Sequence, residues 1–541
     1  MNVLASWFVD LLGGLLWIAL ASAVGGVVWQ VCGVQAWRRT CGIAQIMLVR
    51  GVTVVSVGAI GVALAQGLQL AVKAWLILTA FGPSSWPAMA HTLPFLAGGT
   101  RALLALGLGF AAWGLRMRPN SPHRWAAVSV LAAGILLSGA WLSHGVGRGH
   151  GRAALMTLSV LHHAGGAIWL GGIIQLGMLW GLMRRHPELQ ELWVVWLKRF
   201  SGLATGAVIV SVSTGIALAW SYVGTWQGLL GTGYGALVMA KGCLLAVALV
   251  LGGVNYWAVH RKRRRGANMT ASTLVPGVLE GEILLLSGLM IVAAALASLP
   301  PAADTPDEQV RISEVAEVFR PKWPRLTSPP LAAVRPGALE ASTNSEAALP
   351  VAKADWSNFN HNVSGLFVLM IGSCGLAAHL WGGPWTKHWP LGWVVLGGFL
   401  LVRNDPNDWP LGPIGWWAGM RQAEVLQHRL ATVLVCGLGL LEWRARTSPA
   451  PRRRVSYLFP GLCAFGGVLL LTHAHGALEP RREFLIQVSH TALGVLALIV
   501  ACGRWLELRL EPPAGRFAGL SAHLALLGIG LLLVFYREHP G

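Results

Sequence analysis

The chain has 541 residues, of which 55% are hydrophobic and 12% are charged. This charged share is roughly half that of a soluble domain and is too small to cover a soluble surface of this size. The sequence is therefore that of an integral membrane protein in a lipid bilayer; disorder, a collagen-like fibre and a disulfide-stapled secreted domain are excluded. The net charge of +19 fits basic loops that orient membrane helices, and no basic-aromatic nucleic-acid module occurs, so no nucleic-acid partner is expected.

Long apolar runs predict an all-α, polytopic transmembrane bundle of about fourteen helices. A crossing needs about 20 apolar residues. Eight runs precede the one long polar stretch, at 7–32, 44–72, 94–115, 125–143, 153–183, 200–222, 234–259 and 275–299. Six follow it, at 360–381, 390–402, 427–443, 455–473, 484–503 and 517–536. The run at 390–402 is short for a full crossing.

The polar stretch predicts two membrane halves. We expect an eight-helix domain at 1–305, an external and mostly irregular linker at 306–356, and a histidine-containing bundle of about six helices at 357–541. Basic segments such as RKRRR (261–265) and RARTSPAPRRR (444–454) fall on one side. The positive-inside rule places that side in the cytoplasm, so both termini are expected outside, in the periplasm.

Histidines of the first half gather toward the predicted outer side. His144 and His150 flank the loop SHGVGRGHGR, and His162 and His163 lie about ten residues into the next helix, roughly 15 Å deep. Neutral imidazole is a common ligand for zinc, copper and haem iron. Met156 shares a helix face with His163, and its thioether would favour Cu(I). The alternative for each histidine is a hydrogen bond to a neighbouring helix.

The second half repeats this placement. Its outer-side histidines are His361, His428, His473, His475 and His490. The HxH pair at 473–475 lies at a helix end, where both rings can meet one ion. Two hypotheses follow: a metal site, or a b-type haem held by His428 or His475 together with His490.

A few other residues inside the spans are candidates for a transport pathway. Trp169 lies seven residues after His162, with two glycines between them that allow a second helix to approach closely. Lys241 and Glu280 are ionisable groups inside apolar runs, which usually mark pathways or pairs. Lys241 can instead extend its amine to the membrane surface.

Enzyme chemistry is not expected from the sequence. No paired carboxylates, Ser/His/Asp set or dinucleotide fingerprint occurs in a plausible setting. There is no GxxxxGK[ST] loop or DKTGT-type phosphorylation site, so any transport would be passive or coupled to an ion gradient. The seven cysteines form no CxxC pair, which argues against thiolate zinc and iron–sulfur clusters.

Several ordered sequence blocks resemble a known family. SHG (143–145) and LHHAGGAIWLGGI (161–173) are similar to the signature of the bacterial copper resistance protein D family. The resemblance continues through FSGLATGAVIVSVSTGIALAW (200–220), TGYGALVMAKGCLLAVALVLGGVNYW (232–257) and LEGEILLLSGLMIVAAALASLPPA (279–302). VSYLFPGLCAFGGVLLLTHAHG (455–476) resembles the additional C-terminal membrane region of longer members.

This resemblance implies an inner-membrane protein of copper homeostasis that moves copper into the cytoplasm, with a periplasmic copper-binding protein as partner. It places the copper-linked histidines at His144 and His162. The chain departs from the family at SHG, where GHA is usual, and at Val160, where an acidic or polar residue is usual. The alternatives are a membrane electron carrier with haem b, and a factor that delivers copper to another enzyme.

Overall fold

The computed structural model describes residues 2–34, 43–183, 190–264, 274–335, 345–448, 453–472 and 480–538. Within these ranges the protein is built from helices and contains no strand. Thirteen described helices are long and apolar enough to cross a membrane, and one shorter apolar helix, Leu391–Arg403, accompanies them. The predicted polytopic helical bundle is thus confirmed, including the short run near 390–402.

The first half contains eight long helical segments. The first is continuous from Asn2 to Val34, as α1 (Asn2–Leu20), a π-type turn (Ala21–Gly25), α2 (Gly26–Trp29) and a second π-type turn (Gln30–Val34). The others are α3 (Ile43–Phe81), α5 (Leu93–Met117), α6 (Pro122–Ser138), α7 (Arg152–Met183), α8 (Gln190–Val223), α10 (Gly233–Arg264) and α11 (Leu274–Ser298). Helix α7 packs against α8, α11 and the first segment.

Small residues allow α7 to lie close to its neighbours. A Cβ atom added at Gly165 would meet the backbone carbonyl of Ala207 and the Ser211 side chain on α8. One added at Gly171 would meet the backbone carbonyl of Ala21, in the first π-type turn. Close packing of this kind is the usual basis of helix association in a bilayer, and it brings α1, α7 and α8 together around the histidines.

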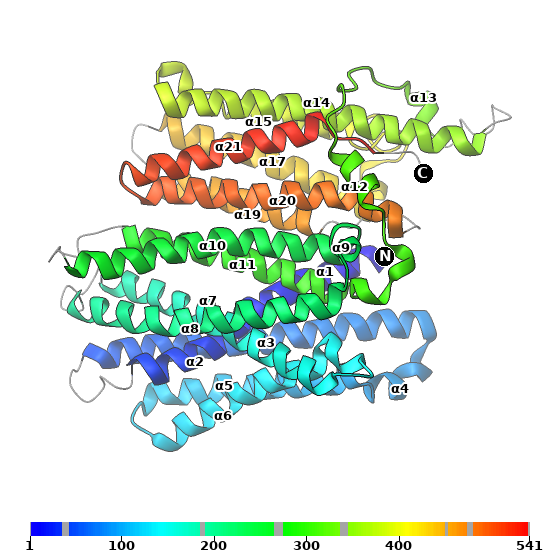
Figure 1. The fold of residues 1–541 in the computed structure, drawn as a ribbon. Helices are drawn as coiled ribbons and strands as arrows, with labels where there is room; N and C mark the ends of the chain where they lie inside the picture. Colours follow the sequence, from blue (N-terminus) through cyan, green and yellow to red (C-terminus); the bar gives the residue numbers. More distant parts are fainter. Residues whose placement is uncertain are drawn as a thin grey trace.

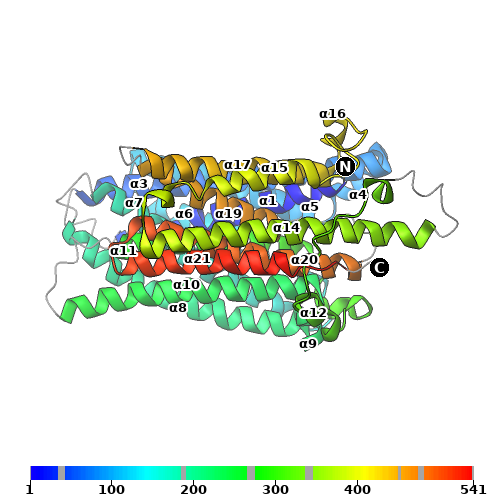
Figure 2. The same cartoon turned by 90° about the horizontal axis from the view of Figure 1, so that it is seen from above.

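Among the described residues, the membrane helices of the second half are five long ones and one shorter apolar one. They are α14 (Ser345–Trp381), α15 (Leu391–Arg403), α17 (Ala423–Thr447), α19 (Leu458–Leu471), α20 (Pro480–Arg509) and α21 (Ala514–Val534). Helix α14 packs along α21, α21 along α20, and α20 along α19, while α15 pairs with α17 (Figures 1 and 2). Helix α14 begins at Ser345, well before the predicted span at 360–381, because its polar first turns project beyond the apolar run.

Helices α10 and α11 join the first half to α20 of the second half. Leu285 and Leu289 of α11 share a buried cluster with Leu498 and Cys502 of α20. Glu280 of α11 accepts hydrogen bonds from the Arg509 guanidinium and, at 2.9 Å, from the Trp505 indole. A carboxylate and a guanidinium paired in this way link the two bundles.

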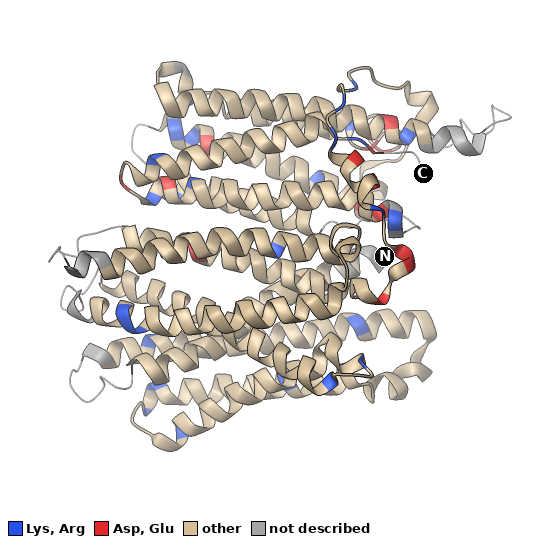
Figure 3. Cartoon of the chain, in the orientation of Figure 1, with Lys and Arg blue, Asp and Glu red and all other residues tan. Residues whose placement is uncertain are grey.

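Both chain termini lie at one end of the bundle, which we call the termini end (Figure 1). The described part of the segment between the halves crosses this end. Its short helix α12 (Ile312–Phe319) buries Val315 and Val318 against Phe484 and Val488 of α20. Farther along, Arg325 pairs with Asp355 at 2.6 Å. Lys and Arg residues, blue in Figure 3, recur at the opposite end of the helices, while the termini end carries both blue and red residues.

Candidate functional site

His162 and His163 sit side by side on α7 but face different helices. The His162 Nδ1 atom lies 2.8 Å from the Ser211 carbonyl of α8 and donates to it as Nδ1–H. The His162 ring also packs against Gly215, where an added Cβ would come within 2.9 Å of Cε1. This hydrogen bond leaves Nε2 as the His162 nitrogen with a lone pair.

His163 faces α1 and α5 instead. Its ring lies 4.4 Å from the Trp17 ring and 6.1 Å from the His162 ring, measured between centroids. Its Nδ1 atom is buried and has no hydrogen-bond partner among the described residues. A buried imidazole nitrogen without a partner is unusual and calls for an explanation.

Positive charge flanks this histidine pair. Arg101 of α5 is 3% exposed and donates to Ser138 Oγ at 3.2 Å. A Cβ atom added at Gly139 would lie 2.9 Å from an Arg101 Nη atom and 3.6 Å from His163 Nδ1, so the guanidinium is close to the ring. Half-buried Lys241 of α10 acts electrostatically on both histidines.

His144 lies in the loop at the termini end that leads into α7. Its ring centroid is 5.8 Å from that of Tyr222 and 6.2 Å from that of Tyr234, and its Nε2 is buried without a hydrogen-bond partner among the described residues. Burial lowers the pKa of His144 below 6.5, while nearby Asp304 opposes that shift. Asp304 itself pairs with Arg148 at 2.6 Å. The ring is therefore held in the neutral form that binds metals.

The remaining first-half candidates differ in exposure. His150 is exposed and Met156 is half-buried, and their part in a metal site stays a prediction. Glu280 faces α20, as described above. The carboxylate enclosed by the first half is Glu282, which is 2% exposed and accepts hydrogen bonds from Asn255 at 2.7 Å and from the Trp169 indole.

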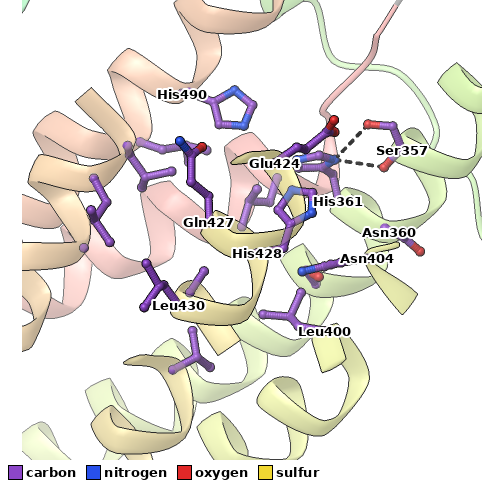
Figure 4. A pocket seen from close by; sticks show the side chains of 18 of the residues that line it. Ser357, Asn360, His361, Leu400, Asn404, Glu424, Gln427, His428, Leu430 and His490 are labelled. Carbon is purple, nitrogen blue, oxygen red and sulfur yellow. Dashed lines mark hydrogen bonds between the residues drawn. The ribbon is translucent and has the colours of Figure 1, made fainter. Parts of the chain in front are cut away.

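The second half contains a cavity of about 640 Å³. Histidines from three helices line it: His361 of α14, His428 of α17 and His490 of α20 (Figure 4). Trp7 of α1 closes one side and donates its indole hydrogen to Thr472 Oγ1 at 3.1 Å. Both halves of the chain therefore contribute to its wall.

Each of these three histidines has its Nδ1 atom held. The Ser357 carbonyl lies 2.9 Å from His361 Nδ1, and the Ile486 carbonyl lies 3.0 Å from His490 Nδ1. Asp405 Oδ1 lies 2.7 Å from His428 Nδ1. An imidazole whose Nδ1–H is donated to a carbonyl or carboxylate presents Nε2 as an acceptor or ligand atom.

The His361 ring is packed between two partners. Tyr536 stacks on it with ring centroids 4.0 Å apart, and the His490 ring lies 5.8 Å away at an interplanar angle of 89°. His428 is near enough to act electrostatically on both histidines. The three second-half histidines thus line one cavity, and their role as metal ligands stays a prediction.

Among the residues that the structure describes, neither group of histidines forms a closed metal centre. Over the described ranges, no set of three or more His, Cys, Asp or Glu side chains is arranged to hold a metal ion. His473 and His475, the predicted HxH ligands, lie outside the described residues. A haem pair of His428 or His475 with His490 stays a prediction. The ring centroids of His361 and His490 lie 5.8 Å apart.

Comparison with known proteins identifies the central part of the chain. Residues 194–296, from α8 to α11, match the family model of copper resistance protein D. This part of the chain is similar to that family, and the resemblance predicted from the ordered sequence blocks is thereby confirmed. The protein is a multi-pass membrane protein with similarity to a copper-related family.

One curated relative extends the match. The copper transport protein CutJ of Bacillus subtilis (strain 168) is 26% identical over 298 residues, which cover 53% of this chain and 51% of the Bacillus protein. The aligned part thus spans about half the length of that relative. No solved structure matches the chain.

Sequence reasoning missed several neighbours of the histidines. Arg101 and Tyr536 come from elements distant in the chain, so no local pattern pointed to them. Asp405 lies in the loop sequence NDPNDWPLGP before α17. A carboxylate in a loop that connects two membrane helices was the sequence feature that could have pointed to it. Glu282 was visible as a second carboxylate beside Glu280, and only packing shows that Glu282 faces the first-half interior.

Proposed function

We propose that the protein binds copper at its termini end through first-half histidines and moves it across the inner membrane. The observation that carries the proposal is a pair of buried imidazole nitrogens, His144 Nε2 and His163 Nδ1, without hydrogen-bond partners among the described residues. A cargo ion would satisfy each atom in turn as it passes from one histidine to the other. The family match at residues 194–296 makes copper the best candidate for that ion.

The route would begin at His144, in the loop that precedes α7. Burial lowers the pKa of His144, so its neutral ring can take up a metal ion without first losing a proton. His162 and His163 lie about ten residues from the start of α7, roughly 15 Å along that helix. They provide a second stop from which the ion could continue inward.

The cations beside the histidine pair favour a site that copper passes through over a site that retains copper. Arg101 and Lys241 raise the electrostatic potential where a copper ion would bind. Because like charges repel strongly in surroundings of low dielectric constant, they weaken copper binding and ease its release. The site would then exchange its cargo.

The orientation follows from charge. Basic side chains recur at the end opposite the termini (Figure 3), and the positive-inside rule assigns that end to the cytoplasm. The termini end would then face the periplasm, where a periplasmic copper-binding protein could deliver the ion to His144. The protein would act without enzymatic chemistry.

The test is copper accumulation in cells that carry His144→Ala or His163→Ala, measured by elemental analysis. We expect each variant to reduce accumulation several-fold, and His150→Ala, at an exposed loop position, to leave it unchanged. Membrane levels of each variant are measured in parallel. Accumulation equal to wild type in both variants, at equal protein levels, would contradict the proposal.

The two alternative functions give different outcomes. If the protein delivers copper to another enzyme, copper accumulation stays normal while metal loading of that enzyme fails. If the second half is an electron carrier, the purified protein shows a Soret band with about one haem b per chain. The three anchored histidines around the second-half cavity favour testing this spectrum.

A further inference from the structure

The cavity of the second half has a polar end and a long apolar part. Along α17 its lining runs from Glu424 to Leu438, roughly 21 Å of helix. Beyond the histidines it is lined mainly by apolar side chains, among them Val368, Leu434, Leu438, Leu493, Val500 and Leu526. A cavity of about 640 Å³ with this lining has the size and polarity of a site for a small, lipid-soluble molecule.

Gln427 supplies a second observation. It is 8% exposed and lines the cavity beside His428 (Figure 4). Neither Oε1 nor Nε2 of its amide has a hydrogen-bond partner among the described residues. Burying both atoms of an amide unpaired is unfavourable, so the site calls for a ligand that can both donate and accept a hydrogen bond there.

The charges at the polar end narrow the ligand class. Four carboxylates line the cavity, at Asp405, Asp408, Glu424 and Glu538, against one lysine, Lys353, among its described lining residues. Because Lys353 is the one lysine or arginine among these described lining residues, this end offers little positive charge to the phosphate of a phospholipid or to the two propionates of a haem. A neutral head group fits it better.

We propose that this cavity binds a quinone or quinol, with its ring at the polar end and its isoprenoid tail along the apolar wall. A quinol hydroxyl can donate to His428 Nε2, because Asp405 holds Nδ1–H on the other side of the ring. The Gln427 Nε2 group can donate a hydrogen bond to an oxygen of the quinone or quinol ring. Gln427 Oε1 can accept a hydrogen bond from a quinol hydroxyl. The isoprenoid tail would lie along Leu434 and Leu493, in the apolar part of the cavity that a polar ligand would leave empty. This binding is independent of copper handling by the first half.

The test uses the full-length protein purified in detergent and decylubiquinol as the probe, with binding followed by isothermal titration calorimetry. We expect saturable binding that weakens about tenfold in Gln427→Leu, the effect of losing roughly one net hydrogen bond. Leu434→Phe, which fills the apolar part without changing any polar group, should weaken binding to a similar extent. Gln69→Leu is the matched control, because Gln69 pairs with the Val9 carbonyl in the first half.

Thermal unfolding of each variant shows whether it is folded, and solvent extraction shows what the purified protein retains. Quinone in the extract, together with weaker binding by both cavity variants, supports the proposal. Absence of saturable binding, equal affinity of wild type and Gln427→Leu, a stoichiometric haem spectrum, or phospholipid as the sole extracted ligand would each overturn it.

Discussion

The two halves of the protein place the same residue type in opposite electrostatic surroundings. In the first half, His162 and His163 lie near the cations Arg101 and Lys241. In the second half, His428 is bound to the carboxylate of Asp405 beside a large cavity. An imidazole near cations binds a positive ion weakly, whereas one anchored to a carboxylate is a good hydrogen-bond acceptor. Counting histidines therefore does not reveal what each group does.

The largest effect is expected where the second half depends on its carboxylate. Asp405→Asn removes the charge that balances His428 and buried Arg429, which lies 3.7 Å from Asp405 Oδ2. Breaking such a buried arrangement should lower the free energy of unfolding by about 3 kcal/mol. Thermal unfolding of the detergent-solubilised protein measures this loss.

The control for that prediction is Asp304→Asn in the first half. The Asp304 side chain is 41% exposed and pairs with Arg148, so its loss should cost less than about 1 kcal/mol. If Asp405→Asn and Asp304→Asn lowered the free energy of unfolding equally, the carboxylate of the second half would not be more important for stability than that of the first half.

A second prediction concerns the cations near the first-half histidines. Arg101→Met removes positive charge beside His163 while keeping an apolar side chain of similar length. If copper binds at this pair, its affinity should rise about tenfold, because less repulsion opposes the ion. Competition with a chromogenic Cu(I) chelator measures the change. The control is Arg116→Met, because the Arg116 guanidinium lies over the Trp113 ring, with Cζ 4.1 Å from the ring centroid. This control should leave the copper affinity unchanged. Weaker copper binding by Arg101→Met would contradict the electrostatic account.

The third prediction is a pH dependence at His144. Burial lowers its pKa in the folded protein below 6.5, so the folded state binds this proton less readily than the unfolded chain. As pH falls, the resulting loss of stability begins near the unfolded value and is complete below the folded one. Copper capture that depends on His144 should accordingly persist below pH 6.5 and fail only at more acidic pH.

Asp304→Asn sharpens this test, because the Asp304 carboxylate raises the pKa of His144 against the effect of burial. In the Asp304→Asn protein, the pH below which His144-dependent copper capture is lost should be lower than in the wild type. The His144-dependent part is the copper captured by each protein minus that captured by the same protein with His144→Ala. A shift to higher pH, or none, would show that Asp304 does not act on this ring.

The smallest effect is expected from Tyr536→Phe. The aromatic ring stacked on His361 remains, and the hydroxyl loses its hydrogen bond to Ser357. The free energy of unfolding should fall by about 1 kcal/mol or less. Tyr536→Ala, which also removes the stacking, should cost clearly more in the same thermal measurement.

Much of the fold was predictable because the bilayer imposes one simple rule. Apolar runs near the length of a crossing predicted the helices, including the short one now at Leu391–Arg403. The start of α14 was missed because its first turns, around Lys353 and Asp355, are polar and carry no membrane signal. Such a helix end is stabilised by pairs such as Asp355 with Arg325, which are distant in sequence.

The candidate sites were predictable only in part. Common depth brought His361, His428 and His490 to one region, which required no knowledge of packing. The sequence did not predict which way each helix is turned about its own axis. Glu280 and Glu282 are two residues apart, yet Glu280 faces Arg509 and Glu282 faces Asn255. The partners that give each histidine its character, such as Asp405, depend on contacts between distant segments.

The pairing of Glu280 with Arg509 has a practical consequence for dissecting this protein. Either half made alone would expose one member of an ion pair to lipid or detergent, with no counter-charge nearby. Two separately encoded fragments, divided within the stretch that crosses the termini end, should therefore reassemble when synthesised together. A single truncated bundle should be recovered in poor yield, and activity assays on it would report a damaged molecule.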